Sequence, residues 1–136
     1  MHKRMIKRRL LSVIAALVFL LSLSGCGAAE NEGSVYMNIG PKEAKKLMEE
    51  LDEFVLLDAR SEEEFSEGHI PGAIVIPHDE ISERAESEIS EKDVPVFVYC
   101  RSGRRSKLAA EALLELGYEK IYEFGGINSW PYEIEN

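Results

Sequence analysis

Cysteine and tryptophan are scarce in this sequence, whose 136 residues include two cysteines and one tryptophan. Because at most one bond, Cys26–Cys100, can form within the chain, a framework of several disulfides is excluded. Paired CxxC motifs and clustered histidines, which are typical of zinc sites, are also missing, so the sequence predicts no metal site. The proportions of hydrophobic residues, 45%, and charged residues, 30%, fit one globular domain.

Acidic residues are absent from the first 25 positions, where five basic residues precede an apolar run at 10–23. This run of 14 residues is shorter than the about 20 that span a bilayer, and with its basic flank it indicates an export signal. Removal of residues 1–25 would leave 11 basic and 25 acidic residues, a net charge of −14. Such an acidic body predicts no nucleic-acid partner, because it repels phosphates.

The end of the apolar run has a specific pattern. Leu23-Ser24-Gly25-Cys26 resembles the lipobox of bacterial lipoproteins, in which cleavage falls before a cysteine whose sulfur carries a diacylglyceryl group. The resemblance implies a signal peptide at 1–25, membrane attachment through lipidated Cys26, and a location in the cell envelope. The alternative is an uncleaved anchor helix with an incidental cysteine. Both interpretations place the domain outside the cytoplasm.

Periodicity separates a tether from a folded domain. Residues 27–38 have no regular apolar spacing, so 26–38 is interpreted as the lipidated N-terminus and flexible tether, and 39–136 as the domain. Within the domain, short apolar runs typical of strands alternate with helical patterns. Strands are expected at 54–57, 73–76, 94–99 and 121–123, and helices at 41–52, 61–67, 79–89 and 103–116. The alternation predicts an α/β fold with a mostly parallel central sheet flanked by helices.

The strongest candidate for chemistry is Cys100, which directly follows the apolar core of the strand expected at 94–99. The next residues, Arg101-Ser102-Gly103-Arg104-Arg105, lead into a helix. Ligands bind at the carboxyl ends of strands in open α/β sheets, and a helix N-terminus stabilises anions. A thiolate there has a lowered pKa, and the arginines are expected to lower it further. The alternative is a buried structural cysteine before an amphipathic helix whose arginines face solvent.

These residues resemble the active loop of single-domain rhodaneses. Three further motifs agree with that family in order and spacing: Asp58-Ala59-Arg60, Gly68-His69-Ile70-Pro71-Gly72-Ala73, and Phe124-Gly125-Gly126 with Trp130. The resemblance covers about 39–130 and implies a rhodanese-like fold. The sequence departs from the family directly after Trp130, where Pro131 follows at once.

The resemblance implies a sulfurtransferase without a cofactor. Cys100 would take a sulfane sulfur from thiosulfate or a related anionic donor, hold it as a persulfide, and pass it to a thiol or cyanide. Backbone N–H groups of 101–105 would surround the added sulfur. We expect Arg101 and Arg104 to attract the donor, Arg105 to shape the loop, and the protein to be a monomer.

Other conspicuous residues have two interpretations each. Asp58 and Arg60 either tune the site electrostatically or brace the sheet as an ion pair, and bracing is favoured. His69 lies between turn residues and is expected to be structural rather than a general base. Trp130 is expected in the core rather than as a binding platform.

Two other functions compete with sulfur transfer. A non-catalytic binding or sulfur-carrier module could retain the same loop. Cysteine phosphatases use a similar strand, loop and helix, but they need an arginine at C-x₅-R to grip two phosphate oxygens. Here Arg105 gives C-x₄-R and Ser106 occupies the sixth position, which favours a loop fitted to one sulfur atom.

Overall fold

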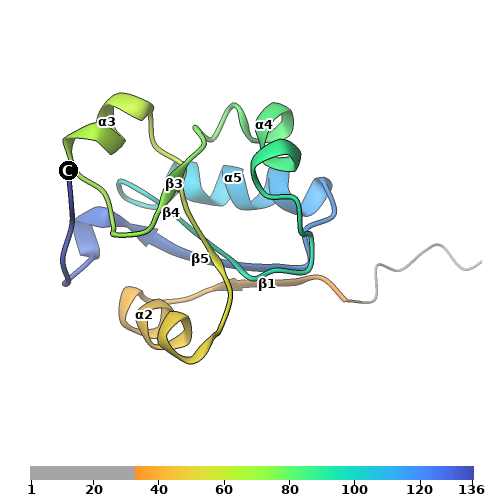
Figure 1. Cartoon of the computed structure of the whole chain (residues 1–136), viewed down its shortest axis with the longest axis horizontal. Coiled ribbons are helices and arrows are strands. Elements are labelled where there is room, and N and C mark those ends of the chain that lie inside the picture. Colours follow the sequence, from red (N-terminus) through yellow and green to blue (C-terminus); the bar gives the residue numbers. More distant parts are fainter. Residues whose placement is uncertain (1–32) are drawn as a thin grey trace, which may run out of the picture. The chain divides into compact units, whose positions relative to one another are not determined.

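Five parallel strands form the centre of the fold (Figure 1), in the order β1-β5-β4-β2-β3. The computed structural model describes residues 33–136. The strands are β1 (Val35–Asn38), β2 (Val55–Asp58), β3 (Ile74–Val75), β4 (Val96–Cys100) and β5 (Lys120–Gly126). The prediction of an α/β fold around a mostly parallel sheet is confirmed.

Helices cover both faces of this sheet (Figure 1). Helix α2 (Pro41–Glu50) packs on one face, and α4 (Ile81–Glu88) and α5 (Arg104–Glu115) pack on the other. Helix α3 (Glu62–Glu67) and the 3₁₀ turn η1 (Ile127–Ser129) complete the domain. As the sequence indicates, Pro41 opens α2, and Ser61 with Glu64 forms a capping box at the start of α3.

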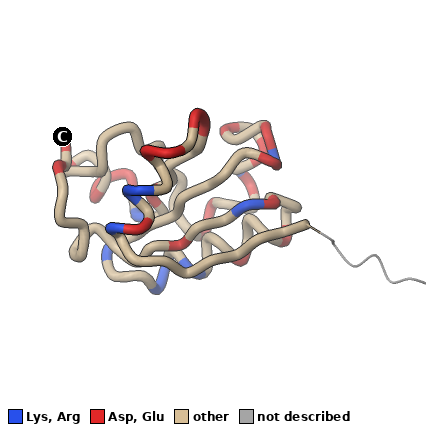
Figure 2. The backbone as a smooth tube through the Cα atoms, turned by 90° about the horizontal axis from the view of Figure 1, so that it is seen from below, with Lys and Arg blue, Asp and Glu red and all other residues tan. Residues whose placement is uncertain are grey.

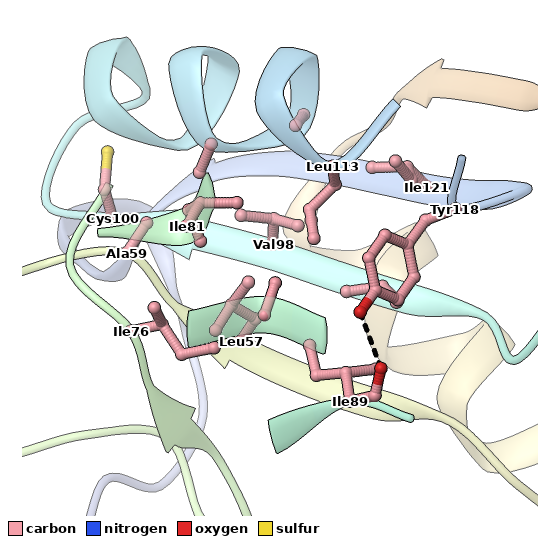
Figure 3. Packing of buried hydrophobic residues seen from close by; sticks show 14 of the residues in the cluster. Leu57, Ala59, Ile76, Ile81, Ile89, Val98, Cys100, Leu113, Tyr118 and Ile121 are labelled. Atoms are coloured by element: carbon pink, nitrogen blue, oxygen red, sulfur yellow. Dashed lines mark hydrogen bonds between the residues drawn. The ribbon is translucent and has the colours of Figure 1, made fainter. Parts of the chain in front are cut away.

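The two faces of the sheet have different cores. The α4 and α5 side is mainly aliphatic, and Figure 3 shows Cys100 at one end of this cluster, with its sulfur pointing away from the apolar side chains. Two alanines of α5, Ala109 and Ala110, are fully buried there, and their small size lets the helix approach the strands closely. The α2 side is rich in aromatic rings, with Phe97, Tyr99 and Phe124 buried at its centre.

Strand β1 corrects the predicted tether. Residues Val35–Asn38, assigned to the tether from the sequence, pair in parallel with β5 at the edge of the sheet. All four side chains are exposed, so the segment lacks the buried alternation by which a strand is recognised in a sequence. Its position depends on main-chain pairing with residues about 85 positions later in the chain. The folded part therefore includes Val35–Asn38.

An irregularity in the pairing of β4 with β5 shapes the carboxyl end of the sheet. Val98 of β4 is paired with Glu123 of β5, and Cys100 of β4 is paired with Gly126 of β5. Between these two pairs the chain advances two residues in β4 but three in β5. The extra residue in β5 makes a β-bulge, which bends a strand and redirects its neighbours. The bulge lies beside Cys100 and extends β5 beyond the predicted 121–123.

The remaining sequence predictions concern residues beyond this domain. The signal peptide, Cys26 and residues 27–32 of the tether lie outside the described residues. Among the residues that are described, no helix is long and apolar enough to cross a membrane.

Figure 2 shows acidic residues distributed over much of the domain with fewer basic ones between them, as the composition requires.

Candidate active site

Cys100 is the last residue of β4 and has 1% of its surface exposed. Its sulfur accepts a hydrogen bond from the Gly103 backbone N–H, with Sγ and N 3.0 Å apart. The Ser106 hydroxyl oxygen lies 3.5 Å from the same sulfur. The thiol therefore lies within the turn between β4 and α5, as the sequence predicts, and its polar neighbours come from that turn and the first residues of α5.

Two glycines give the loop its tight path. Gly103 precedes α5 with φ at +115°, a conformation that other residues rarely adopt. Gly126 lies directly against the loop, since a Cβ atom there would be 2.0 Å from the Arg101 carbonyl oxygen. Only a glycine at 126 allows this approach. The loop is thus held between the start of α5 and the end of β5.

The surroundings of Cys100 favour its thiolate. Burial raises the pKa of the thiol, but its hydrogen bond with the Ser106 side chain and those from the N–H groups of Ser106, Gly103 and Ser102 outweigh burial, so the pKa lies below its usual value. The direction of this shift agrees with the sequence argument. Its main sources are these neutral hydrogen-bonding groups and not the arginines, which were also expected to contribute.

The loop arginines are held by Glu64 of α3. Arg105 donates from Nη1 to Glu64 Oε2 at 2.6 Å and from Nη2 to Oε1 at 3.0 Å, while Arg101 donates from Nε to Oε1 at 3.0 Å. Hydrogen bonding to Arg105 is the largest effect on Glu64 and lowers its pKa to about 2. Arg104 is exposed and forms no ion pair with any residue from 33 onward. Much of the positive charge that the sequence suggested at the mouth is therefore compensated.

Asp58 and Arg60 form a separate buried pair. The Asp58 carboxylate accepts from Arg60 Nε at 3.0 Å and Nη2 at 2.7 Å, and Nη2 also donates to the Gly68 carbonyl. Arg60 lies over the ring of Tyr99, whose hydroxyl accepts from the Ile70 N–H. These contacts tie the end of β2 to the turn at 68–73. The arrangement agrees with bracing rather than with contact to the thiol.

His69 and Trp130 have structural surroundings. The His69 ring stacks on the Phe65 ring, with the two ring centroids 3.7 Å apart. The main chain of His69 pairs with that of Glu135 in an isolated antiparallel bridge. This bridge secures the segment after Trp130, where the sequence departs from the family pattern. Trp130 packs against Phe124 and Tyr132 and is only partly buried, at the edge of the α2-side core rather than within it. Its indole N–H donates to the Glu133 carbonyl.

Sequence reasoning missed two polar residues beneath the loop, Ser106 and Glu123. Both are fully buried, and the Ser106 oxygen is 2.5 Å from Glu123 Oε1. One signal in the sequence was available for Glu123. It stands two positions after Ile121 in a predicted strand, so it shares the face that Ile121 buries.

A second feature lies away from the thiol. A cavity of about 710 Å³ opens between α2 and the C-terminal segment, and none of its lining residues belongs to the loop at 100–106. Its walls include Met48, Phe54, Trp130 and Tyr132. Within 33–136, no group of three or more His, Cys, Asp or Glu residues is placed to hold a metal ion.

Comparison with protein families gives a match over most of the domain. The model of the rhodanese-like domain matches residues 40–132. The chain is 32% identical over 116 residues to the putative sulfur carrier protein YrkF of Bacillus subtilis, covering 85% of this chain and 61% of that protein. It therefore spans less than two thirds of the length of that relative.

Two shorter relatives are named as enzymes. Thiosulfate sulfurtransferase PspE of Escherichia coli is 39% identical over 71 residues, 52% of this chain and 68% of that protein. Thiosulfate sulfurtransferase GlpE of Coxiella burnetii is 33% identical over 97 residues, 71% of this chain and 88% of that protein.

Solved structures share the fold. A rhodanese with anions from E. coli superposes with a TM-score of 0.57 at 34% identity, over 60% of this chain and 96% of that one. The Alr3790 protein from Anabaena sp. superposes with a TM-score of 0.65 at 27% identity, over 74% of this chain and 91% of that one.

Proposed function

The chain belongs to the family of rhodanese-like domains, and from this premise we propose that it is a sulfurtransferase that carries sulfur as a persulfide on Cys100. The observation that carries the proposal is the position of the Cys100 sulfur, which accepts a hydrogen bond from Gly103 N at 3.0 Å at the start of α5. That environment favours a thiolate, and the thiolate is the nucleophilic form of cysteine. Relatives named thiosulfate sulfurtransferases support the same chemistry.

The proposed cycle has two transfers of one sulfur atom. The Cys100 thiolate attacks the outer sulfur of thiosulfate or a related anionic donor, a new S–S bond forms, and sulfite leaves with the electrons of the broken bond. A thiol or cyanide acceptor then attacks the outer sulfur of the persulfide, and the electrons of that bond return to Cys100. No oxidant or cofactor is consumed.

The loop has the groups that this cycle needs. The persulfide's outer sulfur is anionic, and N–H groups of 101–105 at the start of α5 are the donors that we expect to surround it. Exposed Arg104 is the side chain that we expect to draw the anionic donor, since Arg101 and Arg105 already bind Glu64. We assign Arg105 to holding the loop against α3.

A thiosulfate and cyanide assay tests the proposal. The full chain is expected to release sulfite, and Cys100→Ser is expected to reduce the rate by at least about a hundredfold because the nucleophile is lost. Cys26→Ala, which removes the other cysteine, is the matched control and is expected to retain the rate. Turnover unchanged in Cys100→Ser would refute the assignment.

The two competing functions predict different results, one in the same assay and one with a phosphate substrate. A binding or sulfur-carrier module would accept one sulfur on Cys100, seen as a mass increase, without turnover in the presence of cyanide. A cysteine phosphatase would hydrolyse an aryl phosphate. The C-x₄-R spacing leads us to expect no such hydrolysis.

We also propose that the protein acts in the cell envelope as a monomer attached to the membrane through lipidated Cys26. The support is the lipobox-like sequence after a basic and apolar N-terminus. In fractionated cells, Cys26→Ala is expected to move the protein from the membrane to the soluble fraction. Unprocessed wild-type protein in the soluble fraction would contradict the anchor.

A further inference from the structure

Glu123 is a fully buried carboxylate that the proposed cycle does not use. It lies on β5 directly before the bulge, and its side chain faces α5. Oε1 accepts from the Gly125 N–H at 2.9 Å and from the Ser106 hydroxyl at 2.5 Å, while Oε2 accepts from the Asn38 side-chain amide. All three donors are neutral groups, so hydrogen bonds alone stabilise this buried charge.

Ser106 connects this carboxylate to the reactive sulfur. Its oxygen is 2.5 Å from Glu123 Oε1 and 3.5 Å from Cys100 Sγ, and the carbonyl oxygens of Gly103 and Gly125 lie 3.1 and 3.2 Å away. A hydroxyl group has one proton to donate. Glu123 Oε1 is the nearest of these acceptors, so it takes the Ser106 hydrogen bond and leaves a lone pair of Ser106 for the thiol proton.

We propose that Glu123 is a positioning residue that takes up the proton of Cys100 through Ser106. The thiol S–H bond breaks as an O–H bond forms on Ser106, and the original Ser106 proton passes to Glu123 Oε1. Atoms and charge balance, because the pair keeps one proton and one negative charge throughout. The negative charge moves from the carboxylate to the sulfur, where the loop N–H groups stabilise it.

The burial of both groups supports this exchange. Cys100 and Glu123 are separated by one hydroxyl group, and two negative charges so close in a buried site repel strongly. A shared proton lets the sulfur ionise without creating a second buried charge. The inference deepens the proposed function and relies on it only in taking Cys100 as the reacting group.

Few other titratable groups are close to the pair. Tyr36 of β1 has a raised pKa because its hydroxyl is partly shielded from water, although the side chain is exposed, and because the charges of Glu123 and of Glu111 on α5 are near it. Arg105 of α5 has a raised pKa, mainly from Glu64 and to a smaller extent from the charge of Cys100. Neither contacts the hydroxyl that links Glu123 to the sulfur.

Alkylation of Cys100 at different pH values tests the exchange. The full chain carrying Cys26→Ala has one thiol, and its iodoacetamide rate reports the thiolate fraction without requiring sulfur transfer. A shared proton keeps that fraction nearly constant, so we expect the rate to change less than about threefold between pH 6 and pH 8. Glu123→Gln cannot take the proton and is expected to show an ordinary titration, rising about tenfold per pH unit below the thiol pKa.

Variants of Ser106 separate the exchange from a structural effect. Ser106→Ala is expected to show the same steep profile, and the double variant with Glu123→Gln is expected to be no steeper than either single variant. Ser106→Thr keeps the hydroxyl and is expected to keep the flat profile. Glu111→Gln removes a charge near Tyr36 without touching the link, so it is the matched charge control. If Glu123→Gln does not fold, the Ser106 variants decide the question.

Three outcomes would overturn the inference. The first is an ordinary titration in the parent chain, and the second is a flat profile in Glu123→Gln or Ser106→Ala. The third is faster alkylation of Glu123→Gln at every pH with an unchanged profile, which would mean that Glu123 only repels the thiolate. Failure of the proposed function gives a different result, because then sulfite release is missing while the alkylation profiles remain as expected.

Discussion

Asp58 and Glu123 are both fully buried carboxylates near the carboxyl end of the sheet, but they lie on opposite faces and have different partners. Asp58 on the α2 side receives three hydrogen bonds from the guanidinium of Arg60, two from Nε and one from Nη2, and a fourth from the Arg60 backbone N–H. Glu123 on the α5 side receives its hydrogen bonds from the neutral groups of Asn38, Ser106 and Gly125. The two carboxylates are therefore equally buried, but only Asp58 has a cation beside it.

This difference separates a carboxylate paired with a cation from the one to which we assign proton exchange. Arg keeps its charge in proteins, so Arg60 is a permanent cation beside the Asp58 carboxylate. This ion pair also holds the turn at 68–73, because Arg60 binds the Gly68 carbonyl. Glu123 has no such partner among the side chains of 33–136, and a hydroxyl connects it to a thiol whose ionisation the loop favours.

The largest effect that this comparison predicts is the loss of stability in Asp58→Asn. The substitution keeps the shape of the side chain but leaves the Arg60 charge buried without its carboxylate, which is expected to reduce the free energy of unfolding by about 3 kcal/mol. Urea denaturation measures the loss. Adding Arg60→Met removes the uncompensated charge and should recover part of it. A loss below about 1 kcal/mol would mean that Asp58 is not the main partner of Arg60.

The Asp58 and Cys100 regions were predictable because local patterns define them. A buried apolar strand followed by Cys100 and a glycine before a helix predicts the thiol at a helix N-terminus. The capping box of Ser61 and Glu64 lies within four residues, and the structure forms it. Asp58 and Arg60 are two residues apart, so an ion pair was foreseeable.

Contacts between distant residues could not be predicted in this way. Glu64 and Arg105 are separated by 41 positions, and Glu123 is 85 positions from Asn38. Strand alternation places Glu123 on the face that Ile121 buries, but it does not identify the partners of the carboxylate. Those partners come from β1, from α5 and from the irregular end of β5, and β1 gives no pattern in the sequence because its side chains are exposed.

A smaller effect is expected from Glu64→Gln, because Glu64 is partly accessible to solvent. Its pKa is lowered from 4.5 to about 2, chiefly by Arg105, so the ionised form stabilises the fold above pH 4.5 and this contribution is lost as the pH falls toward 2. Glu64→Gln is expected to reduce the free energy of unfolding at pH 7 by about 1 kcal/mol. The difference from wild type should shrink on acidification.

The matched control is Glu67→Gln, which removes the same charge from the same helix. Glu67 is exposed and forms no ion pair with the residues that the structure describes, so its replacement should change the stability at pH 7 by less than about 0.5 kcal/mol. Equal losses in the two variants would show that the net charge of α3, rather than the contact with Arg105, is responsible.

Apart from the Glu67 control, the smallest effect on stability is expected in Glu123→Gln, although the substitution is chemically the same as Asp58→Asn. The side-chain carbonyl of the introduced glutamine can accept from Ser106 and Gly125, and its amide can donate to Asn38 once the Asn38 amide turns to present its oxygen. No cation is left uncompensated, and one buried charge is removed. The free energy of unfolding at pH 7 should therefore change by less than about 1 kcal/mol in either direction. A loss as large as that of Asp58→Asn would show that the fold requires the Glu123 charge, and the distinction between the two carboxylates would fail.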